Sequence, residues 1–122
     1  MLQAASILLF VLGLAHSLLG ERYILVRLFK RNDLPKLFGG SEFTTRTLRF
    51  AWHVTTVLWW GFSVILWQAG ATPLTRDSVL HVVGCTLIVC GFLPLVITRG
   101  KHLSWLALFI IGGICLFQGV TT

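Results

Sequence analysis

Four apolar stretches that contain no charged residue constrain the fold of this chain more than any other feature. The first covers residues 2–19, and as an α-helix it is ~27 Å long, close to the thickness of a hydrocarbon core. The others have similar lengths and cover 50–70, 78–98 and 102–120. Backbone surrounded by lipid must satisfy its own hydrogen bonds, so these runs are expected to be helices. The sequence therefore predicts an all-α fold, a four-helix transmembrane bundle forming one domain over residues 1–122.

The composition agrees with a membrane protein. The chain has 56% hydrophobic and 11% charged residues, whereas a typical globular chain carries roughly 25% charged residues. A water-soluble chain of 122 residues has too little interior for so much apolar surface. No basic residue precedes the first run, and its helical pattern continues through Glu21 and Arg22. We therefore interpret it as a helix of the mature protein and not as a signal peptide.

The basic residues predict the orientation in the membrane. The net charge is +6, and nine of the ten Lys and Arg residues lie in the first and third connections, which an even number of helices places on one side. By the positive-inside rule we expect a cell (inner) membrane protein with both termini outside and both basic loops in the cytoplasm. The charge is then explained by this topology and by contact with anionic lipid head groups, so we expect no nucleic-acid partner. The nine residues are Arg22, Arg27, Lys30, Arg31, Lys36, Arg46, Arg49, Arg99 and Lys101.

The first connection begins with an amphipathic segment at about 21–31, "ERYILVRLFKR". Its basic residues fall near one helical face and its large apolar residues near another. This pattern is typical of a helix that lies in the membrane interface. We expect such a helix between the first two transmembrane helices.

Each predicted helix contains one histidine, and two of the four lie at matched depth on the cytoplasmic side. His16 is about a turn and a half inside Glu21, and His53 is one turn inside Arg49. At 100° per residue, Tyr23 and Arg27 lie on the same stripe as His16. Gly13 and Gly20 flank His16 at i−3 and i+4. Two imidazoles at one depth, with small residues beside one of them and basic residues toward the water, suit a flat macrocycle between helices.

In topology and histidine placement, nearly the whole chain resembles a small four-helix membrane cytochrome b. The resemblance implies that b-type haem is bound by His16 and His53 as axial ligands, with Arg27 and Arg49 facing the propionates and Gly13 and Gly20 making room for the ring. Electron transfer would be the use of this site, in a membrane oxidoreductase or an electron carrier. The chain departs from a two-haem arrangement because its outer side offers only His81.

A metal site is a second interpretation of the same residues. His16, His53 and His102 gather toward one membrane face and suit a three-histidine site for a transition metal. On the outer side, His81 and Cys85 stand four residues apart on one helix and suit a soft metal. The three cysteines form no disulfide framework and no C-x-x-C pair.

Three further functions are compatible with a membrane protein of this size: transport, quinone binding and an accessory role. The apolar runs contain no carboxylate, which disfavours proton-coupled export of cations. A quinone site beside His16 and Tyr23 is another hypothesis. The chain also suits a cofactor-free interaction or accessory subunit, as a homodimer or with a larger membrane partner.

Overall fold

The structure is a computed structural model and describes residues 1–121 of the chain. It is all-helical, which confirms the predicted fold class. The elements are α1 (Leu2–Leu19), a π-helical turn η1 (Gly20–Leu25), α2 (Val26–Leu28), α3 (Glu42–Ala71), α4 (Arg76–Ile97) and α5 (Ser104–Val120).

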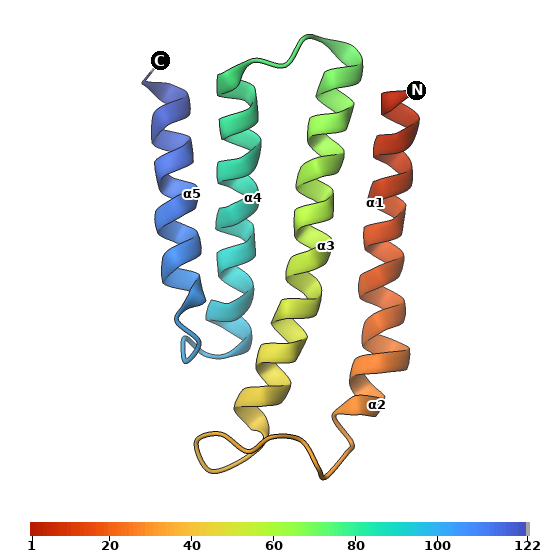
Figure 1. The fold of residues 1–122 in the computed structure, drawn as a ribbon, viewed down its shortest axis with the longest axis vertical. Helices are drawn as coiled ribbons and strands as arrows, with labels where there is room; N and C mark the ends of the chain where they lie inside the picture. The colour runs from red at the N-terminus through yellow and green to blue at the C-terminus, as the bar shows by residue number, and fades with distance from the viewer. Residues whose placement is uncertain (122) are drawn as a thin grey trace.

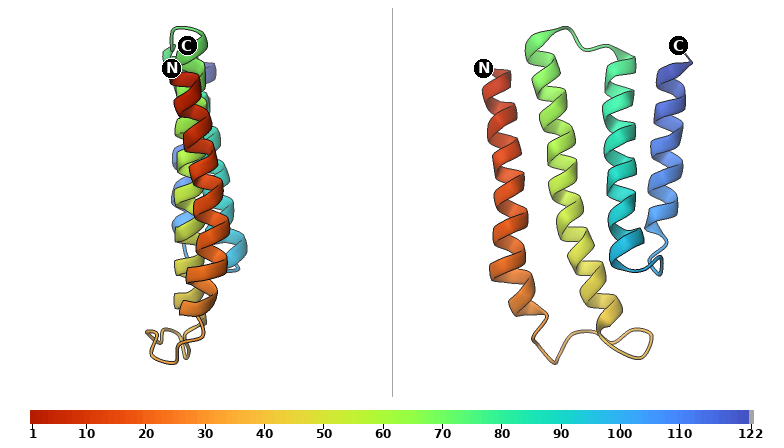
Figure 2. Two further views of the ribbon diagram at one scale, coloured as in Figure 1. Left: turned by 90° about the vertical axis from the view of Figure 1, so that its right-hand side faces the viewer. Right: turned by 180° about the vertical axis from the view of Figure 1, so that it is seen from behind.

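The four long helices stand in a single row in the order α1, α3, α4, α5 (Figure 1). Within residues 1–121, each long helix contacts only its neighbours in this row. Seen from the side, the row is one helix thick (Figure 2). The prediction of a four-helix bundle is therefore confirmed only in part, because the helices form an open layer and not a closed bundle. Both broad faces of the two central helices remain uncovered by protein.

The segment after α1 differs from the prediction of a separate interfacial helix at 21–31. The residues that join α1, η1 and α2 all have right-handed helical dihedral angles, so one helix extends from Leu2 to Leu28. Phe29 and Lys30 form the turn that ends it. The amphipathic pattern thus belongs to the last turns of the first long helix. Its regularity is interrupted only by the π-helical turn, in which the backbone hydrogen bonds join residues five apart instead of four.

Three helices are long and apolar enough to cross a membrane: Leu2–Leu28, Glu42–Ala71 and Arg76–Ile97. The fourth, Ser104–Val120, is apolar and has 17 residues, which corresponds to about 25 Å.

Glycines explain why α5 packs closely along α4. An added Cβ at Gly84 would lie 2.7 Å from Leu116, and one at Gly91 would lie 2.6 Å from Phe109.

The two ends of the row carry different connections. The N-terminus, the α3–α4 connection and the end of α5 lie at one end, and the connections 29–41 and 98–103 lie at the other (Figure 1). The second end is called the basic end here because it holds the nine Lys and Arg residues named above. At the opposite end, α4 begins with a capping box in which the Thr75 hydroxyl accepts from the Ser78 amide.

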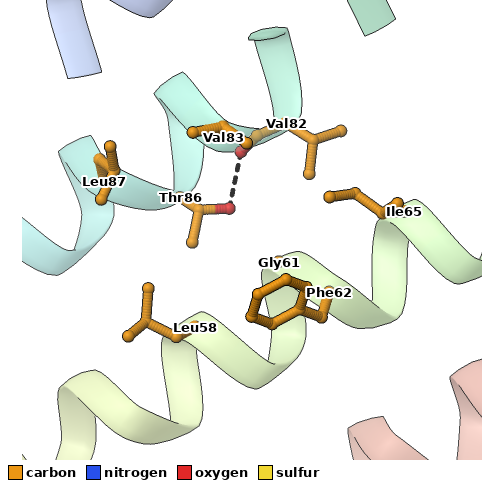
Figure 3. Close-up of a pocket in the computed structure, with 8 residues that line it drawn as sticks. All are labelled: Leu58, Gly61, Phe62, Ile65, Val82, Val83, Thr86 and Leu87. Atoms are coloured by element: carbon orange, nitrogen blue, oxygen red, sulfur yellow. Dashed lines mark hydrogen bonds between the residues drawn. The ribbon is translucent and has the colours of Figure 1, made fainter. Parts of the chain in front are cut away.

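The seam between α3 and α4 is packed less closely than the α1–α3 and α4–α5 interfaces. Gly61 gives the room that the Thr86 side chain needs, since an added Cβ there would lie 2.5 Å from the Thr86 Oγ1. Thr86 donates its own hydrogen bond to the Val82 carbonyl, so it does not bond to α3. Figure 3 shows the groove at this point, with Leu58 and Ile65 of α3 facing α4. The row thus consists of two closely packed helix pairs joined by a looser seam.

Candidate functional site

A chain of polar side chains connects α1 to α3 near the basic end. The Ser17 Oγ lies 2.9 Å from the His53 Nδ1 and 2.7 Å from the Thr56 Oγ1. The other ring nitrogen of His53, Nε2, lies 3.1 Å from the Glu21 Oε2. Arg49 forms an ion pair with the same carboxylate, at 2.8 Å between Nη2 and Oε1. We call Ser17, Glu21, Arg49, His53 and Thr56 the polar network.

With a proton on the His53 Nε2, every hydrogen bond of the polar network can form. His53 then donates to Glu21 and accepts at Nδ1 from the Ser17 hydroxyl, which in turn accepts from the Thr56 hydroxyl. Thr56 is only 2% exposed, so its hydroxyl depends on Ser17 for this bond. Interhelical hydrogen bonds of this kind join helices in membranes. The arrangement therefore fastens α1 to α3.

His16 lies one residue before Ser17 but contacts a different set of side chains. Its ring stacks on Trp52, with 4.5 Å between ring centroids and 2° between the planes, and it lies 4.9 Å from the Trp59 ring. Trp52 donates a hydrogen bond of 3.0 Å from Nε1 to the His16 carbonyl. Gly20 permits this contact because an added Cβ would lie well under 3.0 Å from the Trp52 indole. His16 thus belongs to an aromatic cluster on α1 and α3.

This cluster forms one wall of a groove of 560 Å³ that is lined by α1, η1 and α3. The His16 Nε2 is buried and has no hydrogen-bond partner among the described residues. Tyr23 lines the same groove, and the guanidinium of Arg27 lies 5.9 Å from the centre of its ring. We call the surface lined by Leu12, Ala15, His16, Leu19, Gly20, Tyr23, Ile24, Trp52 and Trp59 the His16 groove.

The residues predicted to hold haem have other partners in this arrangement. Both ring nitrogens of His53 are engaged by the polar network. Arg49 pairs with Glu21 instead of facing a propionate. The space beside Gly13 is occupied by the Trp60 indole, as that beside Gly20 is by Trp52. The small residues do make room for flat rings, but the rings are tryptophans.

We therefore expect the purified protein to lack the spectrum of a b-type cytochrome. The measurement is the visible spectrum of protein extracted in detergent from haem-replete cells. A Soret band with sharp reduced α and β bands, lost in both His16→Ala and His53→Ala, would contradict this expectation and support the haem prediction.

The structure does not bring the residues of the predicted metal sites together. His102 packs against Phe50, at 4.9 Å between ring centroids, and its Nδ1 lies 2.8 Å from the Ser104 Oγ. His81 lies 2.8 Å from the Asp77 carbonyl through its Nδ1, and Cys85 is exposed. Across residues 1–121, no group of three or more His, Cys, Asp or Glu side chains could hold a metal ion. The three-histidine prediction gains no support from this geometry.

Three members of the polar network were not among the predicted site residues: Ser17, Glu21 and Thr56. A signal for them exists in the helical spacing. Ser17 and Glu21 stand four residues apart, and His53 and Thr56 stand three apart, so each pair shares one face of its helix. A stripe of polar residues at this spacing in an apolar helix indicates an interhelical contact.

Comparisons with known protein families, curated proteins and solved structures find no match for this chain. Its class rests on the structure alone. It is an all-helical protein in which three helices are long and apolar enough to cross a membrane.

Proposed function

We propose that the protein is a multi-pass membrane protein of the accessory type, whose function is to bind another membrane protein along its helix row. In this proposal the chain crosses the membrane four times, so both termini lie on the same side. The positive-inside rule then puts the basic end in the cytoplasm and both termini outside. The observation that carries the proposal is the open row itself, in which α3 and α4 have no helix on either broad face.

The exposed side chains on the α3–α4 seam support this function. Val64 and Cys85 line a groove of 240 Å³ on the seam, together with His81. His81 and Cys85 are both exposed there. Ionisable residues within membrane helices almost always face protein or a water-filled cavity, because lipid cannot solvate them. An exposed histidine inside a predicted span is therefore expected to be covered by a partner helix.

The polar network favours the same function. It holds α1 against α3 by bonds that satisfy one another, with both His53 nitrogens and the Glu21 carboxylate engaged. Such a network fixes α1 against α3. A mostly apolar helix pair held in this way suits binding within the bilayer.

Site-specific crosslinking tests the proposal, because Cys85 is the exposed one of the three described cysteines. A photoreactive maleimide is attached to Cys85 in a Cys115→Ser variant, and native membranes are irradiated. We expect one protein adduct of defined mass, lost when Val64→Trp fills the groove. The matched control carries the label on α1 instead, in Leu18→Cys with Cys85→Ser, since Leu18 is 62% exposed. Lipid adducts alone at both positions, or an adduct unaffected by Val64→Trp, would refute the proposal, and an adduct of twice the chain mass would identify the partner as a second copy.

A further inference from the structure

The His16 groove combines apolar walls with polar groups that the protein leaves unpaired. Across residues 1–121, neither ring nitrogen of His16, nor the indole N–H of Trp59, nor the hydroxyl of Tyr23 makes a hydrogen bond to another residue, whereas the Trp52 indole does. All three belong to the lining of this one groove. Polar groups without partners are costly where lipid replaces water, because no solvent molecule completes their bonds.

The groove also presents flat surfaces for stacking. His16 and Trp52 lie parallel, and the Trp59 ring is tilted by 55° to His16. Aromatic rings favour offset stacking or edge contacts with further rings. A volume of 560 Å³ lies in the range of about 300–1,000 Å³ that small-molecule sites occupy.

In the membrane arrangement proposed above, the groove faces lipid. Leu12, Leu19 and Ile24 on its rim are each at least half exposed on the outer surface of α1 and η1. A ligand therefore enters sideways from the hydrocarbon, and an apolar tail remains there against these side chains. The ring of such a ligand lies near the basic end, because Tyr23, which lines the groove, belongs to the π-helical turn that follows α1.

We propose that the His16 groove binds the ring of a lipid-soluble quinone. A quinone has a flat ring, two carbonyl oxygens that only accept hydrogen bonds, and an isoprenoid tail. The tryptophan N–H and the tyrosine hydroxyl are donors, and neutral imidazole supplies one more from Nδ1, because the His16 Nε2 is buried by protein. The unpaired groups of the groove thus match the acceptors of the ring, and its rim matches the tail. The proposal is independent of the partner protein proposed above.

Quenching of tryptophan fluorescence tests the binding with the full chain in lipid nanodiscs. The probes are a short-tailed ubiquinone and a short-tailed menaquinone, which share this ring chemistry and show which ring is preferred. We expect saturable quenching by at least one of them. His16→Phe keeps a stacking ring but removes both nitrogens, and it is expected to raise the Kd about tenfold, the effect of one lost hydrogen bond.

Two further variants keep the test decisive. Tyr23→Phe removes only a hydroxyl from a side chain that is 49% exposed, so it leaves the fold intact, and it is expected to raise the Kd several-fold. His81→Phe is the matched control, since it removes an exposed histidine from α4, outside this groove, and its Kd is expected to equal that of the parent. Quenching that does not saturate, or equal Kd values in all four proteins, would overturn the proposal. Displacement of the quinone by an alkylbenzene of the same tail length at equal concentration would also overturn it, because the groove would then bind apolar chains only.

Discussion

Replacing Gly20 by alanine is expected to lower the free energy of unfolding by about 1–3 kcal/mol, the usual cost of overpacking a well-filled contact. The added Cβ would lie well under 3.0 Å from three atoms of the Trp52 indole. The indole is held by His16 in two ways, since it stacks on the His16 ring and donates to the His16 carbonyl. It therefore has to shift as a whole ring, and the contact between α1 and α3 opens with it.

The matched control for this substitution is Gly113→Ala on α5. An added Cβ at Gly113 meets no atom within 4 Å, so no contact is disturbed. Alanine also has the higher helix propensity, so we expect no loss of stability there. Unfolding in detergent, followed by steric trapping or by denaturant titration of tryptophan fluorescence, measures both variants. Equal stability of the two variants would show that Trp52 does not pack against Gly20.

Ser17→Ala is expected to cost about 1–2 kcal/mol, because removing one hydroxyl leaves two other groups without a partner. The Thr56 hydroxyl and the His53 Nδ1 both bond to this oxygen. Water does not readily replace it, since Thr56 is only 2% exposed. The effect is larger than the average of ~0.6 kcal/mol for a single interhelical hydrogen bond in membranes.

A double-mutant cycle measures the interaction energy between Ser17 and Thr56, apart from the effect of removing side-chain volume. The cycle uses Ser17→Ala, Thr56→Val and the combination of the two. We expect the double variant to be more stable than the sum of the single effects predicts, by about 0.5 kcal/mol or more, because each single change already breaks the shared bond. Thr55→Ala is the control, since the Thr55 hydroxyl bonds only to the Ala51 carbonyl of its own helix. Additive effects would mean that Ser17 and Thr56 do not interact in the membrane.

The helices could be predicted from the sequence because absence of charge is a local property. The expected runs at 2–19, 78–98 and 102–120 overlap the helices of the structure closely, whereas α3 begins at Glu42, well before the expected residue 50. Its first turns carry Arg46 and Arg49, which a search for charge-free runs excludes. Arg46 forms an ion pair with Glu42 one turn earlier, which stabilises this extension of the helix.

The arrangement of the helices could not be predicted in the same way. In a soluble protein the apolar face of a helix indicates which side packs against its neighbour. A membrane helix is apolar all round, so its residue pattern does not reveal which side contacts protein. The open row was missed for this reason. The depth of His16 and His53 followed from the flanking charges, but their partners did not. The π-helical turn at Gly20–Leu25 changes the phase after His16, and nothing in the residue pattern indicates it.

The single row has a consequence for how the protein responds to damage. In a closed bundle every helix supports several others, whereas here each contact joins only two neighbours along a line. The stability of such an assembly approximates a sum of nearest-neighbour terms, as in repeat proteins. A defect between α1 and α3 therefore leaves the α4–α5 pair intact, and the α3–α4 seam is the place where the line separates first. We therefore expect the molecule to unfold as two hairpins in series, α1–α3 and α4–α5.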